Sequence, residues 1–176
     1  MRIGTESAAG AGGGSDRKQP PIDVYDAVIG CIEDVGIQKG FGDKPPRRVV
    51  VIGVELIQTA SGEPYRGEKG EREVLFKKYN LNLWRKDDGS KMSDFRAFLD
   101  GIKPGRVAEV WAVGGEVDTA EWVGLPVRVT VDHDAKGRAM VKGFMKSKAA
   151  PGTFKLERDY TQPFGLWDYL LKHQEG

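Results

Sequence analysis

The segment at residues 47–59, RRVVVIGVELIQT, is the strongest strand signal in the chain and constrains the fold more than any other feature. With a period of two, it has one wholly apolar face and one mixed face. The apolar face holds Val50, Ile52, Val54 and Leu56, and the mixed face holds Val49, Val51, Gly53 and Glu55. Gly53, in the middle of the strand, predicts a bend or the close approach of another backbone.

Four further strands are predicted from alternation and β-branched residues. The first begins after Ile22 and ends at Gly36. Another is residues 73–84, which is the third strand in chain order. The last two, in LPVRVTVDH and GRAMVKGFMKSK, form a hairpin around a turn at residues 132–137. In the final strand we expect Met140, Lys142, Phe144 and Lys146 to share one face.

Helical signals occur at two places. Residues 91–101, KMSDFRAFLDG, repeat apolar residues at helical spacing, with Ser90 or Ser93 as the N-cap and Gly101 with Pro104 as the stop. Residues 103–124 predict a short helix plus loops. The C-terminal LWDYLLKH predicts a short amphipathic helix, which either docks a partner or lies back on the sheet.

The element order is therefore strand, strand, strand, helix, strand, strand. This order is typical of the OB-fold, a mainly β, five-stranded Greek-key barrel with a helix between its third and fourth strands. We expect a disordered tail at residues 1–21, because its Gly, Ala, Ser and Pro residues bury too little apolar surface. The OB-fold domain is expected at residues 22–150, followed by a C-terminal extension at residues 151–176.

The composition limits the classes of function. The chain has 176 residues with 27 basic and 26 acidic side chains, so a nucleic-acid surface requires local segregation of charge. One cysteine, Cys31, excludes an intramolecular disulfide, and with two histidines it excludes the usual Cys/His zinc site. There is neither a membrane-length apolar run nor a secretory signal, so a cytoplasmic protein is expected.

Residues 73–84, EVLFKKYNLNLW, form a strand with two different faces. The face that can dock on a core holds Leu75, Lys77, Tyr79, Leu81 and Leu83. The opposite face holds Phe76, Lys78, Asn80, Asn82 and Trp84. Rings stack on unpaired bases and ammonium groups attract phosphates, so the second face favours binding of a single nucleic acid strand.

The predicted DNA-binding residues extend from this strand to its neighbours. On or near the non-core side of the sheet are Arg47, Phe76, Lys78, Trp84, Arg128, Lys142, Phe144 and Lys146. In the flanking connections are Lys39, Phe41, Tyr65 and Arg66. A bulge would exchange the faces of the third strand, so Lys77 and Tyr79 are the alternative DNA-binding candidates on this strand. In the alternative interpretation, Phe76 and Trp84 cover a second apolar layer beneath residues 103–124.

The remaining acidic, histidine and cysteine residues considered for metal binding or catalysis have ordinary structural interpretations. Asp132, His133 and Asp134 fit a hairpin turn better than a metal site. We interpret Glu55, Glu71 and Glu73 as solvated strand charges and Cys31 as a small buried hydrophobe. We expect no catalytic residues, metal ligands or cofactor, and therefore no enzyme. A hydrolase is the weakest alternative.

The sequence resembles the OB-fold single-stranded DNA-binding proteins of tailed bacteriophages. The resemblance covers roughly residues 25–146 and rests on the following segments: YDAVIGCIEDVG, RRVVVIGVEL, FKKYNLNL, SKMSDFRAFLDG and GLPVRVTVDHDAKGRA. It implies sequence-tolerant binding of single-stranded DNA during replication or recombination, in the host cytoplasm. Members of this class often end in an acidic tip, whereas this chain ends LWDYLLKHQEG.

The alternative function is an OB-like protein-interaction module, a replication or recombination accessory. The sequence is compatible with contacts between the C-terminal segment and replication or recombination proteins. It is also compatible with a homo-oligomer.

Overall fold

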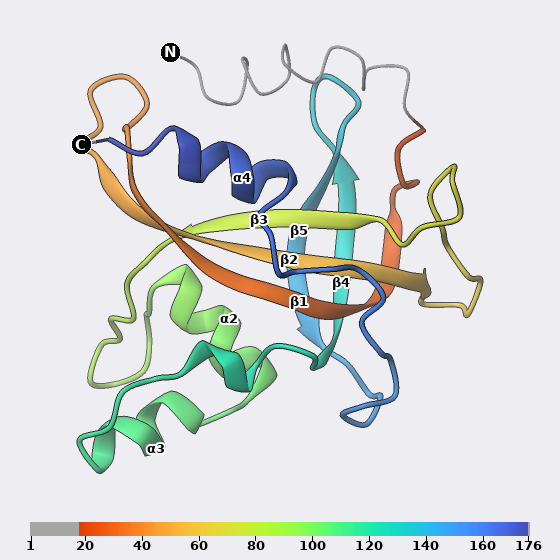
Figure 1. The fold of residues 1–176 in the computed structure, drawn as a ribbon. Coiled ribbons are helices and arrows are strands. Elements are labelled where there is room, and N and C mark those ends of the chain that lie inside the picture. Colours follow the sequence, from red (N-terminus) through yellow and green to blue (C-terminus); the bar gives the residue numbers. More distant parts are fainter. Residues whose placement is uncertain (1–17, 176) are drawn as a thin grey trace.

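The computed structural model describes residues 18–175, which form a mainly β structure around one five-stranded antiparallel sheet (Figure 1). The strands are β1 (Asp23–Gln38), β2 (Arg47–Thr59), β3 (Val74–Asn80), β4 (Pro126–His133) and β5 (Ala139–Lys146). The helices are α2 (Asp94–Ile102), α3 (Arg106–Ala112) and α4 (Gly165–Lys172), with a single 3₁₀ turn, η2 (Thr119–Glu121). The predicted strands, the helix after the third strand and the C-terminal helix are confirmed, but the third strand ends at Asn80 and not at Trp84.

The strands lie in the order β3-β2-β1-β4-β5. The helix α2 contacts both edge strands, β3 and β5, and these two strands also approach each other. Ser93 caps α2, since its hydroxyl accepts a hydrogen bond from the Arg96 N–H at 3.2 Å. Residues 103–124 contain α3 and η2 joined by loops, as predicted.

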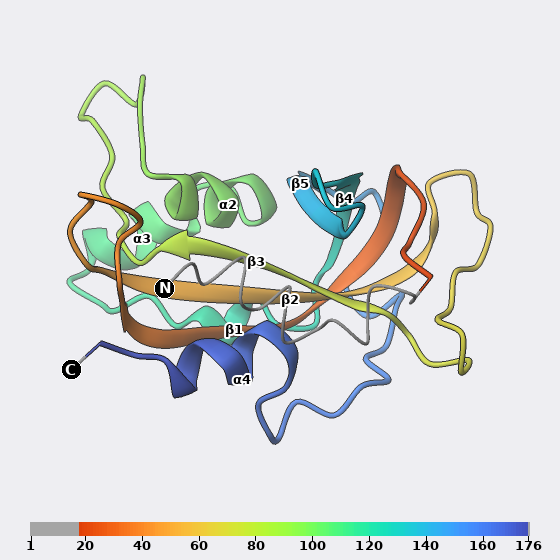
Figure 2. The same cartoon turned by 90° about the horizontal axis from the view of Figure 1, so that it is seen from above.

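Two apolar clusters lie on opposite faces of β1 and β2. The inner cluster joins Val50, Ile52, Val54 and Leu56 of β2 to Phe95 and Leu99 of α2 and to the valines of β4. The outer cluster joins Cys31, Val35, Val49 and Val51 to Trp167 and Leu170 of α4. Figure 2 shows α2 and α4 on opposite sides of these strands. The C-terminal segment therefore lies back on the sheet.

Gly53 is explained by side chains rather than by a neighbouring backbone. A Cβ at this position would lie 2.8 Å from the Cys31 sulfur and 2.9 Å from the ring of Phe76. Such separations are shorter than van der Waals contact. The glycine makes room for the Phe76 ring, so the predicted backbone approach is wrong.

Glu55 is completely buried and Glu73 is also buried, so the interpretation of these two residues as solvated charges is wrong. The Glu55 carboxylate accepts hydrogen bonds from the Glu157 and Arg158 N–H groups at 3.0 and 3.1 Å. The Tyr160 hydroxyl donates at 2.9 Å, and Arg72 lies 3.4 Å away. A buried carboxylate needs such partners. Glu55 thus attaches the C-terminal segment to the outer face of the sheet.

The first strand continues past its predicted end at Gly36. Gly36 has a φ of +77° and lies in a register shift between Asp34 and Ile37, with its N–H bonded to the Asp34 carboxylate at 2.9 Å. Glycine adopts this conformation without strain. The residue forms a bulge within β1, which runs on to Gln38.

A bulge between β4 and β5 changes the face of Phe144. The β4–β5 register shifts between Thr130 and Val131, so Val131 pairs with Val141 while Val129 pairs with Phe144. The Phe144 ring packs edge to face on Phe98 of α2, with ring centroids 4.7 Å apart. Lys146 pairs with the buried Val127 in the same register. The expectation that Phe144 and Lys146 lie on the non-core side is therefore wrong, because one inserted residue reverses the alternation.

The predicted tail at residues 1–21 lies mostly outside the described residues. Its described end, residues 18–21, is bonded to the sheet and to the connection between β2 and β3. The Lys18 N–H donates to the Glu68 carboxylate, and the Gln19 side chain accepts a bond from the Ala139 N–H, both at 3.0 Å. The Tyr25 hydroxyl donates to the Pro21 carbonyl at 2.7 Å. These four residues are ordered, in contrast to the prediction.

Candidate functional site

The face assignment predicted for the third strand is correct over Val74–Asn80, whereas Asn82 and Trp84 lie beyond the end of the strand. Its pairing with β2 runs from Val49↔Asn80 to Glu55↔Val74 in an unbroken register. Tyr79 lies opposite Val50 on the inner face, whereas Lys78 lies opposite Val51 on the outer face. The exchange of faces that would bring Lys77 and Tyr79 outward does not occur in this pairing.

The outer face of β3 is covered near its middle. The ring of Phe76 contacts Phe164, with centroids 5.4 Å apart, and a Cβ at Gly165 would lie 2.9 Å from the same ring. A second apolar layer over Phe76 therefore exists, as the alternative interpretation expected. The covering element is the C-terminal segment and not residues 103–124.

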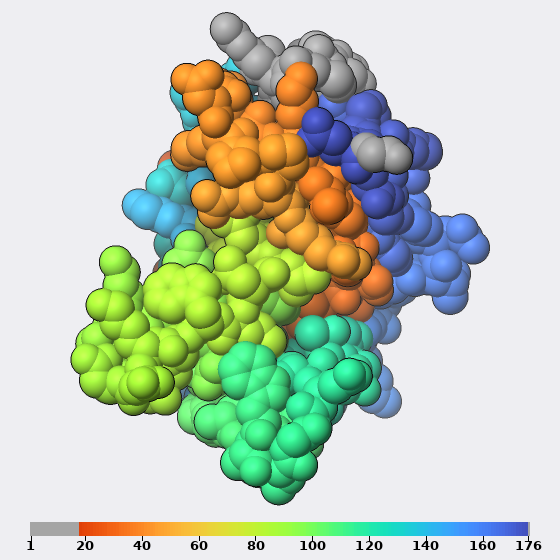
Figure 3. All heavy atoms as spheres, turned by 90° about the vertical axis from the view of Figure 1, so that its left-hand side faces the viewer, coloured from red at the N-terminus to blue at the C-terminus, as the bar shows by residue number. Residues whose placement is uncertain are grey.

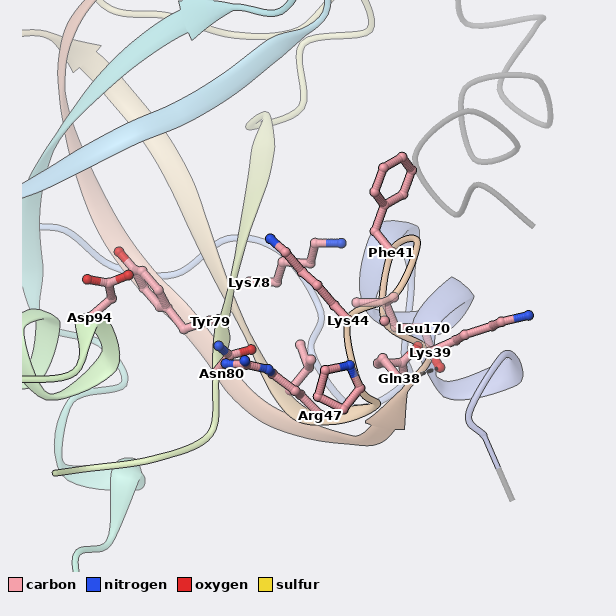
Figure 4. A pocket seen from close by; sticks show the side chains of 13 residues that line it. Gln38, Lys39, Phe41, Lys44, Arg47, Lys78, Tyr79, Asn80, Asp94 and Leu170 are labelled. Carbon is pink, nitrogen blue, oxygen red and sulfur yellow. Dashed lines mark hydrogen bonds between the residues drawn. The ribbon is translucent and has the colours of Figure 1, made fainter.

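A pocket of about 420 Å³ opens where the β1–β2 loop meets the end of β3 (Figure 4). Five of the predicted residues line it: Lys39, Phe41, Arg47, Lys78 and Tyr79. Gln38, Lys44, Asn80 and Asp94 complete its polar lining. The floor is fixed to α4, because the Gln38 side-chain amide donates to the Leu170 carbonyl at 2.9 Å.

Four cations surround this pocket: Lys39, Lys44, Arg47 and Lys78. Within residues 18–175, none of these four side chains takes part in an ion pair or a side-chain hydrogen bond. Figure 4 shows Lys44 and Lys78, from the loop and from β3, extending toward the same side. Unpaired cations of this kind attract an anionic ligand at low energetic cost, because no internal partner must first be displaced.

The β1–β2 loop holds an aromatic ring outward at the rim. Phe41 is 75% exposed. A hydrogen bond from the Lys44 N–H to the Phe41 carbonyl, 3.2 Å long, closes the loop, and Gly42 has a φ of +61°. A Cβ at Gly40 would clash with the carbonyl of Lys44. The loop therefore presents one ring and two lysines in a tight turn.

Tyr79 forms the inner wall of the pocket. Its ring packs on Phe95 and Phe98, with centroids 6.4 and 6.1 Å away, and the Lys77 ammonium lies 5.7 Å from its centre. Burial raises the pKa of the Tyr79 phenol to about 12, and the charge of Asp94 adds to the shift. Tyr79 is neutral at physiological pH and belongs partly to the core.

The remaining predicted residues lie outside this pocket, and most have internal partners. Arg66 makes a two-point contact with Glu157 at 2.7 and 2.9 Å. Arg128 pairs with Asp26 at 2.9 Å, and Lys142 lies 3.7 Å from Asp132. Tyr65 packs edge to face on Tyr25, with centroids 5.7 Å apart. Lys146 is exposed on β5.

A second, open pocket of about 1000 Å³ follows the first along the chain. Residues 81–87 form one side and α3 forms part of the other, with Trp84 and Trp111 both in its lining. Residues 78–80 line the first pocket, so one continuous segment runs through both. Figure 3 shows the β1–β2 loop, this segment and α3 on one face of the molecule. The sequence pattern identified Trp84 but gave no signal that Trp111 joins it.

Comparison with protein-family models, curated proteins and solved structures gave no match. In the part of the chain that the structure describes, three or more His, Cys, Asp or Glu side chains do not gather in an arrangement that could hold a metal ion. The same part of the chain contains no helix with the length and apolar character needed to cross a membrane.

Proposed function

We propose that this protein binds single-stranded DNA without catalysis and with little sequence preference. The strand lies across the pocket between the β1–β2 loop and the end of β3. Lys39, Lys44, Arg47 and Lys78 contact phosphates, and Phe41 stacks on a base. The ring-and-cation combination is the usual basis of sequence-tolerant binding to single strands.

The unpaired state of those four cations carries the proposal. The chain as a whole has a formal net charge of only +1, and many of its surface cations are paired with carboxylates. Concentration of free positive charge at one pocket is the local segregation that a nearly neutral nucleic-acid-binding protein requires. An exposed ring at the rim distinguishes this pocket from a simple anion site.

We also propose that the sheet is an OB-fold. The strand order β3-β2-β1-β4-β5, the helix between β3 and β4 and the approach of β3 to β5 support this fold. An OB-fold binds oligonucleotides near strands two and three and the adjoining loops. The first pocket lies at that position. The resemblance to phage proteins supports a role in replication or recombination, within the host cytoplasm.

The test is a titration of fluorescently labelled oligo-dT, followed by anisotropy, at two salt concentrations. We expect saturable binding that weakens as salt rises, with weaker binding to a duplex of the same length. The affinity for single-stranded RNA of the same length shows whether the protein prefers DNA or RNA. Absence of binding to oligo-dT at low salt would contradict the proposal, and co-purification of a protein partner would then favour the interaction module.

A further inference from the structure

The second pocket gathers both exposed tryptophans of the chain. Trp84 is 48% exposed and Trp111 is 46% exposed, whereas the other two, Trp122 and Trp167, are 0% and 7% exposed. Exposed indoles are costly in water, and their concentration in one pocket marks a binding surface. The two rings come from separate elements, the segment after β3 and helix α3.

Arg96 holds the two sides of this pocket together. Arg96 is 3% exposed, and its guanidinium donates to the Leu83 carbonyl at 3.2 Å and contacts Asp100 at 3.1 Å. The same guanidinium lies 5.1 Å from the ring centre of Trp111. It therefore occupies one face of the Trp111 indole while it fixes the backbone beside Trp84. The remaining surface of Trp111 is available to a ligand.

The segment that bears Trp84 is fixed in a second way. The Ser93 N–H donates to the Trp84 carbonyl at 2.9 Å, and the Ser93 hydroxyl donates to the Asn82 carbonyl at 2.8 Å. These bonds join the segment to the start of α2. Within residues 18–175, the Trp84 ring has no ring or cation contact of its own. The backbone at Trp84 is thus held in place, and its indole is left unstacked.

We infer that the pocket between Trp84 and Trp111 holds one or two unpaired nucleobases, as an extension of the strand path. This inference rests on the proposed function. Residues 78–87 pass through both pockets, so a strand that follows β3 past Lys78 and Asn80 arrives at Trp84. Lys86 lines the second pocket and supplies a cation for the phosphate. Stacking on indoles suits every base, which matches sequence-tolerant binding.

A proline-rich peptide is the other ligand that an aromatic groove can accept. Continuity with the cationic pocket favours the nucleobase. A neutral peptide would gain nothing from Lys39, Lys44, Arg47 or Lys78, whereas a polyanionic strand engages both pockets at once. The test therefore has to separate the tryptophan pocket from the cationic pocket.

The experiment compares Trp84→Ala, Trp111→Ala and the wild type in binding to labelled oligo-dT by anisotropy. We expect each substitution to weaken binding roughly 5- to 150-fold, the range for loss of one stacked base. Both side chains are about half exposed, so thermal unfolding of the variants should stay close to the wild type. Trp167→Phe, in the buried outer cluster, is the control and should bind as the wild type does.

Intrinsic fluorescence gives a second readout. Oligo-dT should quench the wild type, and the quenching should disappear in Trp84→Phe/Trp111→Phe because the remaining tryptophans are buried. If the wild type binds and both alanine variants bind equally well, the inference fails while the proposed function stands. Quenching by a proline-rich peptide together with unchanged oligo-dT binding in the variants would also overturn it. If the wild type itself does not bind oligo-dT, the proposed function fails first.

Discussion

The Phe76 ring packs edge to face against Phe164, at 5.4 Å between centroids and an interplanar angle of 69°. This contact joins the middle of β3 to the segment that precedes α4. It partly covers an aromatic residue that the strand pattern placed among the stacking candidates. The exposed candidates of this face are consequently those beyond the cover, Lys78 at the strand end and Trp84 after it.

Phe76→Ala and Lys78→Ala should separate stability from binding. Phe76→Ala should lower the free energy of unfolding by about 2–3 kcal/mol, because a partly buried ring seated between Gly53 and Gly165 leaves a cavity. Its affinity for oligo-dT should change less than twofold. Lys78→Ala should leave thermal unfolding unchanged and weaken binding several-fold. A large loss of affinity with unchanged stability in Phe76→Ala would show that the outer face opens to bind DNA.

Glu55→Gln should destabilise the protein by about 3 kcal/mol in urea denaturation. The substitution removes the charge that balances Arg72 and turns a donor toward the N–H groups of Glu157 and Arg158. Glu63→Gln, an exposed change in the β2–β3 connection, is the control and should cost less than about 0.5 kcal/mol. Equal effects of the two substitutions would mean that Glu55 does not attach the C-terminal segment.

Stability should fall in alkaline solution. Burial raises the pKa of the Cys31 thiol from 9.0 to about 12 and that of the Tyr25 phenol from 10.0 to about 12. The folded state therefore keeps protons that the unfolded state loses above about pH 9. The stabilisation is complete below that pH and is lost as the pH rises toward 12, by up to about 1.4 kcal/mol per pH unit for each group.

Cys31→Ala tests whether the buried thiol contributes to this loss of stability in alkaline solution. The variant should show a shallower decline of unfolding free energy between pH 9 and 11 than the wild type, whatever its absolute stability. The measurement is urea denaturation at several pH values in that range. Parallel curves for the two proteins would contradict the buried state of the thiol.

The salt dependence of binding should show whether the loop lysines contact phosphates. In Lys39→Ala/Lys44→Ala, the slope of log K against log salt should shrink by about 1.4, at about 0.7 for each lost phosphate contact to a single strand. Lys155→Ala removes an exposed charge from the C-terminal segment, away from the pocket, and should leave the slope unchanged. Equal slopes for the double variant and the wild type would show that these lysines do not contact phosphates.

Local pattern predicted much of the sheet. The alternation of Val50, Ile52, Val54 and Leu56 correctly assigned the two faces of β2, because the strand is long and regular. The same pattern failed at Phe144, where a bulge that turn residues do not signal reversed the faces. Gly36 marked another bulge, although in the sequence it resembles a strand end.

The candidate site was harder to predict, because it depends on contacts between distant segments. Nothing near Phe76 in the sequence indicates that Phe164 and Gly165 cover it, and nothing near Glu55 indicates its bonds to residues about 100 positions later. Trp111 lies in the same pocket as Trp84 through the packing of α3 on α2, in which Arg96 contacts both sides of the pocket. Such placements arise from tertiary packing and leave no periodic signal in the chain.

The most direct measurement of where DNA binds is the change in backbone amide NMR signals of the ¹⁵N-labelled protein when oligo-dT is added. We predict shifts concentrated in residues 39–47 and 78–87, with α4 and the residues around Phe164 nearly unchanged. Shifts confined to α4 and the outer sheet face would contradict the proposed path, and an unchanged spectrum at saturating oligo-dT would contradict DNA binding itself.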